Sequence, residues 1–167
     1  MEKKTLSPST QEIIKSWLKS PYDPETRSEV KKMVEKNPQE AEDAFSSHLK
    51  FGTGGLRALM GVGPGRMNKY TIQTVTGGVA NYLLSSSNDL WKNGVVICYD
   101  CRIHSKEFAE EAAMVLMGNE IPVYLVRQLM PTPFASFCVR YYGAAAGINI
   151  TASHNPKEYN GYKVYWR

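Results

Sequence analysis

The chain has 167 residues, the length of one ordinary domain, and its 43% apolar and 22% charged residues are typical of a folded globular protein. No apolar run approaches the roughly 20 residues that cross a bilayer, and the N-terminal stretch MEKKTLSPSTQE lacks the apolar core of a secretory signal. We therefore expect a cytoplasmic location and no membrane partner. The net charge of +4 arises from basic residues interleaved with acidic ones, which favours solvated helix faces over a nucleic-acid-binding stripe.

The first 48 residues predict a helical extension. Ser9 or Thr10 is expected to cap a first helix, and the break SPYDP should end it because proline cannot continue a helix. Pro24 and then Asn37-Pro38 are expected to open two further helices, since proline fits the first helical position.

Residues 49–167 predict an α/β domain. The glycine-rich stretch FGTGGLRALMGVGPGRMN indicates loops and short strands, and residues 71–87 return to helical spacing. Further along the chain, strands 94–100, 121–127 and 144–151 alternate with helices 105–119 and 132–143. This alternation predicts a mixed, largely parallel sheet with helices on both of its faces.

Three cysteines, an odd number, argue against a disulfide framework in a chain without an export signal. Cys98 and Cys101 have C-x-x-C spacing and His104 follows, which would suit a metal or redox site. Cys98, however, lies in the apolar run VVICY. We therefore favour a buried structural thiol at this position.

Polar residues follow two of the predicted strands at their carboxyl ends, where functional loops of such sheets gather. Asp100 and Arg102 follow VVICY, and residues 151–156, Thr-Ala-Ser-His-Asn-Pro, follow GINI. A capped strand-to-helix turn would also place an Asp there. Residues 100–102 alone do not decide between capping and catalysis.

Ser153 could be a hydrolase nucleophile or a phosphate carrier. A hydrolase needs a base within reach, but His154 is the next residue in extended backbone and points to the opposite face, and no G-x-S-x-G elbow surrounds the serine. A carrier needs an exposed hydroxyl, cations and an acid/base group. Pro156 makes a rigid exit from the turn, and strand alternation directs Lys163 to one face with Gly161, although a strand lysine can also simply reach water.

The sequence from Gly52 to Arg57 is a second candidate for anion binding. It matches neither the dinucleotide fingerprint nor the P-loop ending. Glycines let backbone N–H groups approach an anion, and the fork of Arg57 matches phosphate oxygens. A flexible turn with a surface arginine is the alternative.

Together these motifs resemble those of the α-D-phosphohexomutases, the phosphoglucomutase/phosphomannomutase group. The resemblance rests on Phe51–Arg57, Asp100-Cys-Arg102 with Ser105, Pro131-Thr-Pro133, Thr151–Pro156 and Asn160-Gly-Tyr-Lys163, which occur in the family's order. The helical extension and the stretch GINITASHNPKEYNGYKVYW resemble the phosphoglucomutase-2 and phosphopentomutase branch most. The resemblance implies the first domain of a four-domain mutase that interconverts glucose 1-phosphate and glucose 6-phosphate through a phosphoserine and a bisphosphorylated sugar.

The resemblance also implies roles for individual residues. Ser153 would be the phosphoserine and would bind Mg²⁺ through its phosphoryl oxygen, and glucose 1,6-bisphosphate would prime the enzyme. The remaining expected site residues are His154 and Lys163 for proton transfer, Arg57 for catalysis and phosphate binding, Thr53, Gly54 and Asn155 for substrate binding, and Asp100, Arg102, Asn160 and Gly161 for structure near the site.

The sequence contains no Asp-Gly-Asp metal loop, so we expect an incomplete first domain that is inactive alone, in a truncated or broken chain. Tyr162, Val164 and Trp166 should form a strand face that no following element covers. The preferred sugar (glucose, mannose or pentose phosphate), mutase versus bisphosphate-synthase activity, and the oligomeric state stay open. A non-catalytic sugar-phosphate-binding module is the rival from another class.

Overall fold

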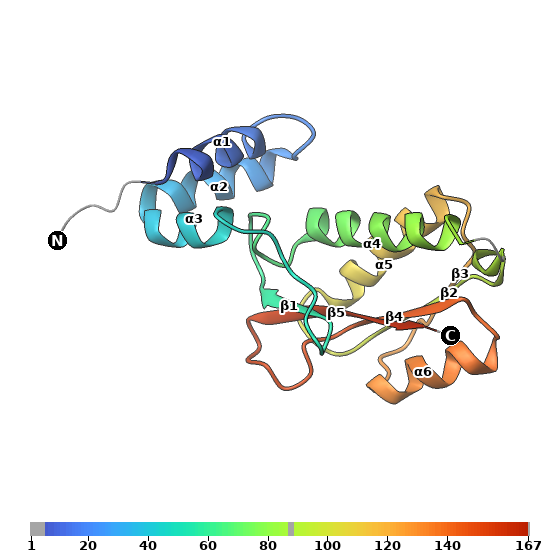
Figure 1. Cartoon of the computed structure of the whole chain (residues 1–167). Helices are drawn as coiled ribbons and strands as arrows, with labels where there is room; N and C mark the ends of the chain where they lie inside the picture. Colours follow the sequence, from blue (N-terminus) through green and yellow to red (C-terminus); the bar gives the residue numbers. More distant parts are fainter. Residues whose placement is uncertain (1–5, 87–88, 167) are drawn as a thin grey trace.

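The computed structural model describes residues 6–86 and 89–166 (Figure 1). Three helices come first, and a five-stranded sheet with three further helices follows. The elements are α1 (Pro8–Trp17), α2 (Pro24–Lys36), α3 (Pro38–Phe45), β1 (Leu56–Leu59), α4 (Lys69–Leu84), the short 3₁₀ helix η1 (Leu90–Asn93), β2 (Val95–Tyr99), α5 (Ser105–Gly118), β3 (Val123–Leu125), α6 (Thr132–Tyr141), β4 (Ala146–Ile150) and β5 (Tyr159–Trp166).

The strand order in the sheet is β1-β5-β4-β2-β3. Strands β3, β2 and β4 pair in parallel, whereas β5 runs antiparallel to both of its neighbours, β1 and β4. Four strands therefore run one way and only β5 is reversed, which confirms the mixed, largely parallel sheet. The reversal is made by the short segment between Ile150 and Tyr159, which contains the serine motif.

Helices cover both faces of the sheet, as predicted. Helices α4 and α5 lie on one face and α6 on the other (Figure 1). The main core lies under α4 and α5 and includes Leu116 of α5 with Ile97 and Ile148 of the sheet. A smaller cluster under α6 contains Val96, Cys98 and Val139. Strands β2 and β4 are buried along their whole length because both of their faces are covered.

The N-terminal helices pack around a core of their own, formed by Trp17, Val30 and Phe45 with their neighbours. Pro24 and Pro38 open α2 and α3 as the sequence predicted, with Asp23 and Asn37 as the capping residues. The prediction for the first cap was wrong. Ser7 caps α1, because Pro8 occupies the first helical position and the Ser7 hydroxyl accepts a hydrogen bond from the Thr10 N–H.

Tyr70 of α4 ties this helical extension to the sheet domain. Its ring makes an edge contact with Trp17, at 5.7 Å between ring centroids, and its hydroxyl donates to Asp23 Oδ2 at 2.6 Å. Lys69 adds an ion pair with the same carboxylate at 3.0 Å. The hydroxyl of Tyr70, with bonds from Thr26, holds the pKa of Asp23 well below its usual range.

The expectation that Tyr162, Val164 and Trp166 form an uncovered face was wrong for most of that face. Helix α4 covers it, so that Tyr162 is fully buried and its hydroxyl shares a hydrogen bond of 3.0 Å with Thr76. Val164 packs at the edge of the main core. Only Trp166, at the end of β5, is 48% exposed, and it packs on Tyr82 at 5.0 Å between ring centroids.

Cys98 of β2 and Cys138 of α6 are buried in the cluster between the sheet and α6, whereas Cys101 is exposed. Cys98 and Cys101 therefore belong to different environments, and the prediction of a buried structural thiol at Cys98 is confirmed. Burial raises the pKa of Cys98 to about 12 and also raises that of Cys138. Among residues 6–86 and 89–166, no helix combines the length and the apolar character that crossing a bilayer requires.

The cysteines give a first prediction. At about pH 8, iodoacetamide should alkylate Cys101 and leave Cys98 and Cys138 unmodified, because only an accessible thiolate reacts. Peptide mass spectrometry measures the labelling, and addition of concentrated denaturant should expose all three thiols. Rapid labelling of Cys98 under native conditions would contradict this packing.

Close packing around Gly161 of β5 gives a second prediction. A Cβ there would lie 2.6 Å from the carbonyl oxygens of both Leu56 and Thr151. Gly161→Ala should therefore lower the free energy of unfolding by about 1–3 kcal/mol, the usual cost of overpacking. Gly77 of α4 has nothing within 4 Å, so Gly77→Ala should instead raise it by about 0.5–1 kcal/mol. Urea unfolding measures both values, and equal effects would refute the prediction.

Candidate functional site

Ser153 lies in the turn that reverses the chain between β4 and β5. The residue is exposed, and its backbone has a φ of 57°, in the left-handed region that residues with a Cβ seldom adopt. The Ser153 N–H donates to the hydroxyl of Thr151 at 2.9 Å, which helps to hold this conformation. A strained, solvent-facing residue on a well-fixed turn is a frequent feature of functional sites.

Arg102 holds the main chain of the turn in place through its carbonyl oxygens. Its guanidinium donates to the carbonyl oxygens of Ser153 at 2.8 Å and Asn155 at 2.6 Å through Nη2. Nη1 donates to those of Pro156 at 2.9 Å and Tyr159 at 3.0 Å. The side chain of Arg102 is only 12% exposed. Its bonds to Asn155 and Tyr159 are partly buried, whereas those to Ser153 and Pro156 lie at the surface. All four are charge-assisted, which makes them stronger than bonds between neutral groups.

Asp100 in turn anchors the segment that carries Arg102. Its Oδ1 accepts from the Arg102 N–H at 3.0 Å and from the Ser105 hydroxyl at 2.9 Å. Buried Asn160 completes the network by donating to Ser105 Oγ at 3.0 Å and accepting from the Gly161 N–H at 2.8 Å. The end of β2 and the start of β5 are thus joined beside the turn. Asp100 does not cap the helix that follows, because the N-cap residue of α5 is His104 and no side chain makes a capping bond there.

Arg57 of β1 stands on the other side of the turn. Its Nη1 approaches Asn155 Oδ1 and its Nη2 approaches the Gly54 carbonyl oxygen, both at 3.4 Å. These contacts are long, and Arg57 is only partly buried. The structure therefore brings the glycine-rich turn and the serine turn together, with a weakly held guanidinium between them.

Lys163 of β5 lies beside the glycine-rich turn. A cavity of about 360 Å³ is lined by residues 51–55, Lys163, Val164 and Tyr165. Thr53 and Gly54 are exposed there, and Gly55 is packed so closely against β5 that its Cβ would lie 2.6 Å from the Tyr162 carbonyl oxygen. The cavity thus offers backbone, hydroxyl and ammonium donors together.

His154 and Lys163 make no hydrogen bond to Ser153 within the part of the chain that the structure describes. His154 is exposed next to the serine, and Lys163 faces the cavity of the glycine-rich turn. Their expected roles in proton transfer stay predictions. Arg57, Asn155 and Arg102, in contrast, are joined to the turns by direct bonds.

The described residues offer no cluster of side chains that could hold the expected magnesium ion. Across residues 6–86 and 89–166, no three His, Cys, Asp or Glu side chains gather as a metal cage would require. The described residues alone do not fit a bound metal. A phosphoryl group on Ser153 would be the one ligand expected here.

Two residues near the site have no role of their own in the sequence prediction. Thr151 belongs to the serine motif, and its hydroxyl proves to be the acceptor that fixes Ser153. Asn149 is fully buried in β4, where its Nδ2 donates to Thr132 Oγ1 at 3.2 Å and its Oδ1 has no partner among the described residues. The sequence did hold a sign that Asn149 is unusual, because an amide side chain stands between two isoleucines in a strand predicted to be buried.

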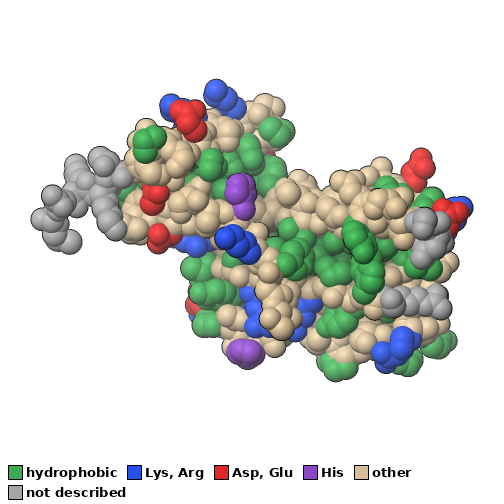
Figure 2. Space-filling view, viewed as in Figure 1, with side chains coloured by type: hydrophobic (Ala, Val, Ile, Leu, Met, Phe, Trp, Pro, Cys, Tyr) green, Lys and Arg blue, Asp and Glu red, His purple; other side chains and the backbone are tan. Residues whose placement is uncertain are grey.

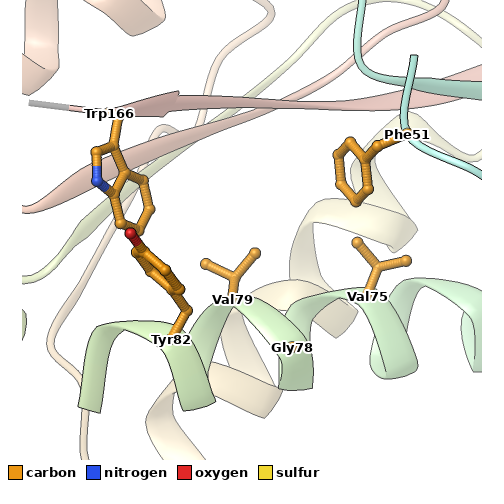
Figure 3. A pocket seen from close by; sticks show the side chains of 6 residues that line it. All are labelled: Phe51, Val75, Gly78, Val79, Tyr82 and Trp166. Atoms are coloured by element: carbon orange, nitrogen blue, oxygen red, sulfur yellow. The ribbon is translucent and has the colours of Figure 1, made fainter. Parts of the chain in front are cut away.

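A separate apolar groove of about 500 Å³ lies between α4 and the end of β5 (Figure 3). Its lining residues are Phe51, Val75, Gly78, Val79, Tyr82 and Trp166. Hydrophobic side chains gather on this face of the molecule, as Figure 2 shows between α4 and the sheet. The groove holds no carboxylate, imidazole or cation among its described lining residues, so it does not offer the chemistry of the serine turn.

Comparison with known proteins connects these observations. Residues 48–167, more than half of the chain, match the family described as phosphoglucomutase/phosphomannomutase, alpha/beta/alpha domain I. The human phosphopentomutase is 45% identical over 157 residues, which cover 90% of this chain and 26% of that protein. The phosphoglucomutase of Staphylococcus haemolyticus is 49% identical over 124 residues, covering 74% of this chain and 22% of that protein.

Solved structures support the same fold. A Thermus thermophilus protein, provisionally described as a phosphomannomutase, superposes with a TM-score of 0.63 and 31% identity, covering 72% of this chain and 26% of that one. The chain spans about a quarter of the length of the curated relatives that it matches. By its fold, its serine turn and the match over residues 48–167, the chain belongs to the phosphoglucomutase/phosphomannomutase family, of which it carries domain I.

Proposed function

We propose that this chain is the phosphoryl-carrying part of a sugar-phosphate mutase, with Ser153 as the residue that holds the phosphoryl group. The observation that carries the proposal is the Ser153 turn, which is exposed and strained at the serine yet fixed underneath by Arg102. A carrier must present one oxygen to two different ends of a sugar while its own position stays constant. Rigid support beneath an open face meets that requirement.

The proposed reaction has two phosphoryl transfers. In the first, the P–O bond at Ser153 Oγ breaks, a hydroxyl oxygen of the sugar monophosphate bonds to phosphorus, and the hydroxyl proton passes to a nearby base. In the second, the bisphosphorylated sugar has turned round, its other phosphoryl group bonds to Ser153 Oγ, and a proton returns to the sugar oxygen. The serine ends as it began, so the net change is an isomerisation.

We assign the supporting roles by chemistry. His154 and Lys163 are proposed to exchange the proton, because each is a titratable group near one of the two turns. Arg57 and Asn155 are proposed to bind phosphate, since the long contacts of Arg57 leave its fork available to a stronger acceptor. Thr53 and Gly54 would add donors from the cavity wall.

A divalent cation such as Mg²⁺ would neutralise charge that builds on the transferred group. The described residues do not supply its other ligands, so we propose that the complete activity belongs to a polypeptide of the relatives' length. Glucose 1,6-bisphosphate as primer, a sugar-phosphate substrate and a cytoplasmic location belong to the same proposal. So does the division of the chain at residue 48 into a helical extension and domain I.

Glucose 1-phosphate is the substrate that we propose first. Pentose phosphates are a second candidate, because relatives named phosphopentomutase are 45% identical over 90% of this chain. A binding module without catalysis would keep ligand affinity and lose nothing when Ser153 is changed. Changing the serine therefore separates a carrier from a binding module.

The central test of this proposal is Ser153→Ala in a full-length phosphohexomutase that carries this chain as its first quarter. Conversion of glucose 1-phosphate should fall by at least about a thousandfold, because the atom that accepts phosphorus is gone. Ser85→Ala, at the exposed end of α4, should change nothing. Mass spectrometry of the unmodified protein should find phosphate on Ser153 that moves to added sugar phosphate. Full turnover in Ser153→Ala would rule the proposal out.

Arg57 gives a prediction about binding. Arg57→Lys should raise the KM for the sugar phosphate about tenfold, since lysine cannot offer two parallel N–H bonds to phosphate. The fold should be unaffected, because the guanidinium makes only two long contacts with the described residues. Steady-state kinetics measures the KM, and the urea midpoint checks the fold. An unchanged KM would remove Arg57 from the phosphate site.

A further inference from the structure

We propose that Arg102 is a positioning residue for phosphoryl transfer, an inference that rests on the proposed role of Ser153 as phosphate carrier. Its bonds go to main-chain carbonyl oxygens at 2.6 to 3.0 Å, on residues 153, 155, 156 and 159. Its Nε faces Asp100 Oδ2 at 3.7 Å. Both terminal nitrogens of the guanidinium are thereby hydrogen-bonded and Nε is ion-paired, so Arg102 is poorly placed to bind a substrate directly.

The need for an arginine follows from the shape of the turn. Four carbonyl oxygens converge on one small region. Those of Asn155 and Tyr159 are bonded in partly buried positions, where an unpaired carbonyl would be unfavourable. A guanidinium has planar N–H groups in fixed directions and can serve four acceptors at once, whereas an ammonium has three donors at one point. The turn is therefore built around this particular side chain.

The same bonds determine where the backbone N–H groups of the turn point. In a trans peptide the C=O of one residue and the N–H of the next point in opposite directions. Because the Ser153 and Pro156 carbonyls face Arg102, the N–H groups of His154 and Lys157 face away from it. In the described part of the chain neither of these N–H groups donates to a protein acceptor. They are available to an anion on the open side of the turn.

This arrangement explains how Arg102, on the carbonyl side of the turn, can affect chemistry on its open side. A phosphoryl group on Ser153 develops charge during transfer, and donors fixed in advance stabilise it best. Arg102 fixes both the left-handed backbone of Ser153 and the directions of the two outward N–H groups. Arg57, with its two long contacts, is suited to direct phosphate binding instead.

Amide hydrogen exchange on this chain tests the structural half of the inference. The N–H groups of Ser153, Asn155 and Tyr159 bond within the turn. In Arg102→Met they should exchange at least about tenfold faster, while those of Ile148 and Ile150 in β4 stay protected. Arg140→Met is the matched control, since Arg140 is an exposed arginine whose guanidinium bonds to Ser136 Oγ, and it should leave the turn unchanged. Unaltered turn exchange in Arg102→Met would overturn the inference.

Arg102→Lys is the second variant and keeps the charge without the fork. If Arg102→Met also speeds exchange in β4, amide exchange is measured in Arg102→Lys instead. In that variant only the turn amides should exchange faster. Equal protection of the turn in Arg102→Lys and the unmodified chain would contradict the need for a guanidinium. Either variant therefore decides the structural question.

The catalytic half is tested in a full-length phosphohexomutase that carries this chain. Arg102→Lys should lower kcat about 100-fold and change the KM less than about threefold, because a misplaced reacting oxygen slows transfer more than binding. Added guanidinium ion should restore much of the kcat of Arg102→Ala, which a purely structural defect would not allow. A normal kcat in Arg102→Lys, with phosphate still found on Ser153, would refute the inference alone. Absence of phosphate on Ser153 in the unmodified enzyme would instead refute the proposed function.

Discussion

The reversal of β5 is the constraint on which the site depends. A strand inserted antiparallel between β1 and β4 must turn back within the eight residues that separate Ile150 from Tyr159. Such a short return directs several carbonyl oxygens inward, away from any ladder partner. Arg102, just beyond the end of β2 on the far side of β4, supplies the donors that they lack. The serine turn is consequently a by-product of sheet topology that one side chain makes stable.

The same reversal assembles the rest of the site. Residue pairing places Arg57 opposite Gly161, so that β1 runs beside the returning strand. Gly161 permits this because the carbonyls of Leu56 and Thr151 leave no space for a Cβ. The glycine-rich turn before β1 then lies against Lys163. Two motifs that are far apart in sequence thus share one side of the sheet.

The sequence predicted what depends on local pattern. Strands β2 and β4 were recognisable because continuous apolar runs indicate burial on both faces. Helices α2 and α3 were recognisable because proline fits the first helical position. The family resemblance implied a structural place for Arg102 near the site. The four bonds that it makes were not predictable, since its partners are backbone carbonyls, which leave no trace in side-chain spacing. The burial of Tyr162 under α4 was missed for a related reason: alternation shows which residues share a face, not what covers it.

Because the guanidinium of Arg102 bonds to the main chain of the turn, these bonds do not depend on which side chains the turn carries. Positions 154, 157 and 158 are exposed and contribute no side chain to the described network beneath. Substitution of those residues would alter the chemical character of the open side of the turn and leave the path of its main chain unchanged. In such a scaffold, the exposed side chains of the turn can diverge without any change in how its main chain is held.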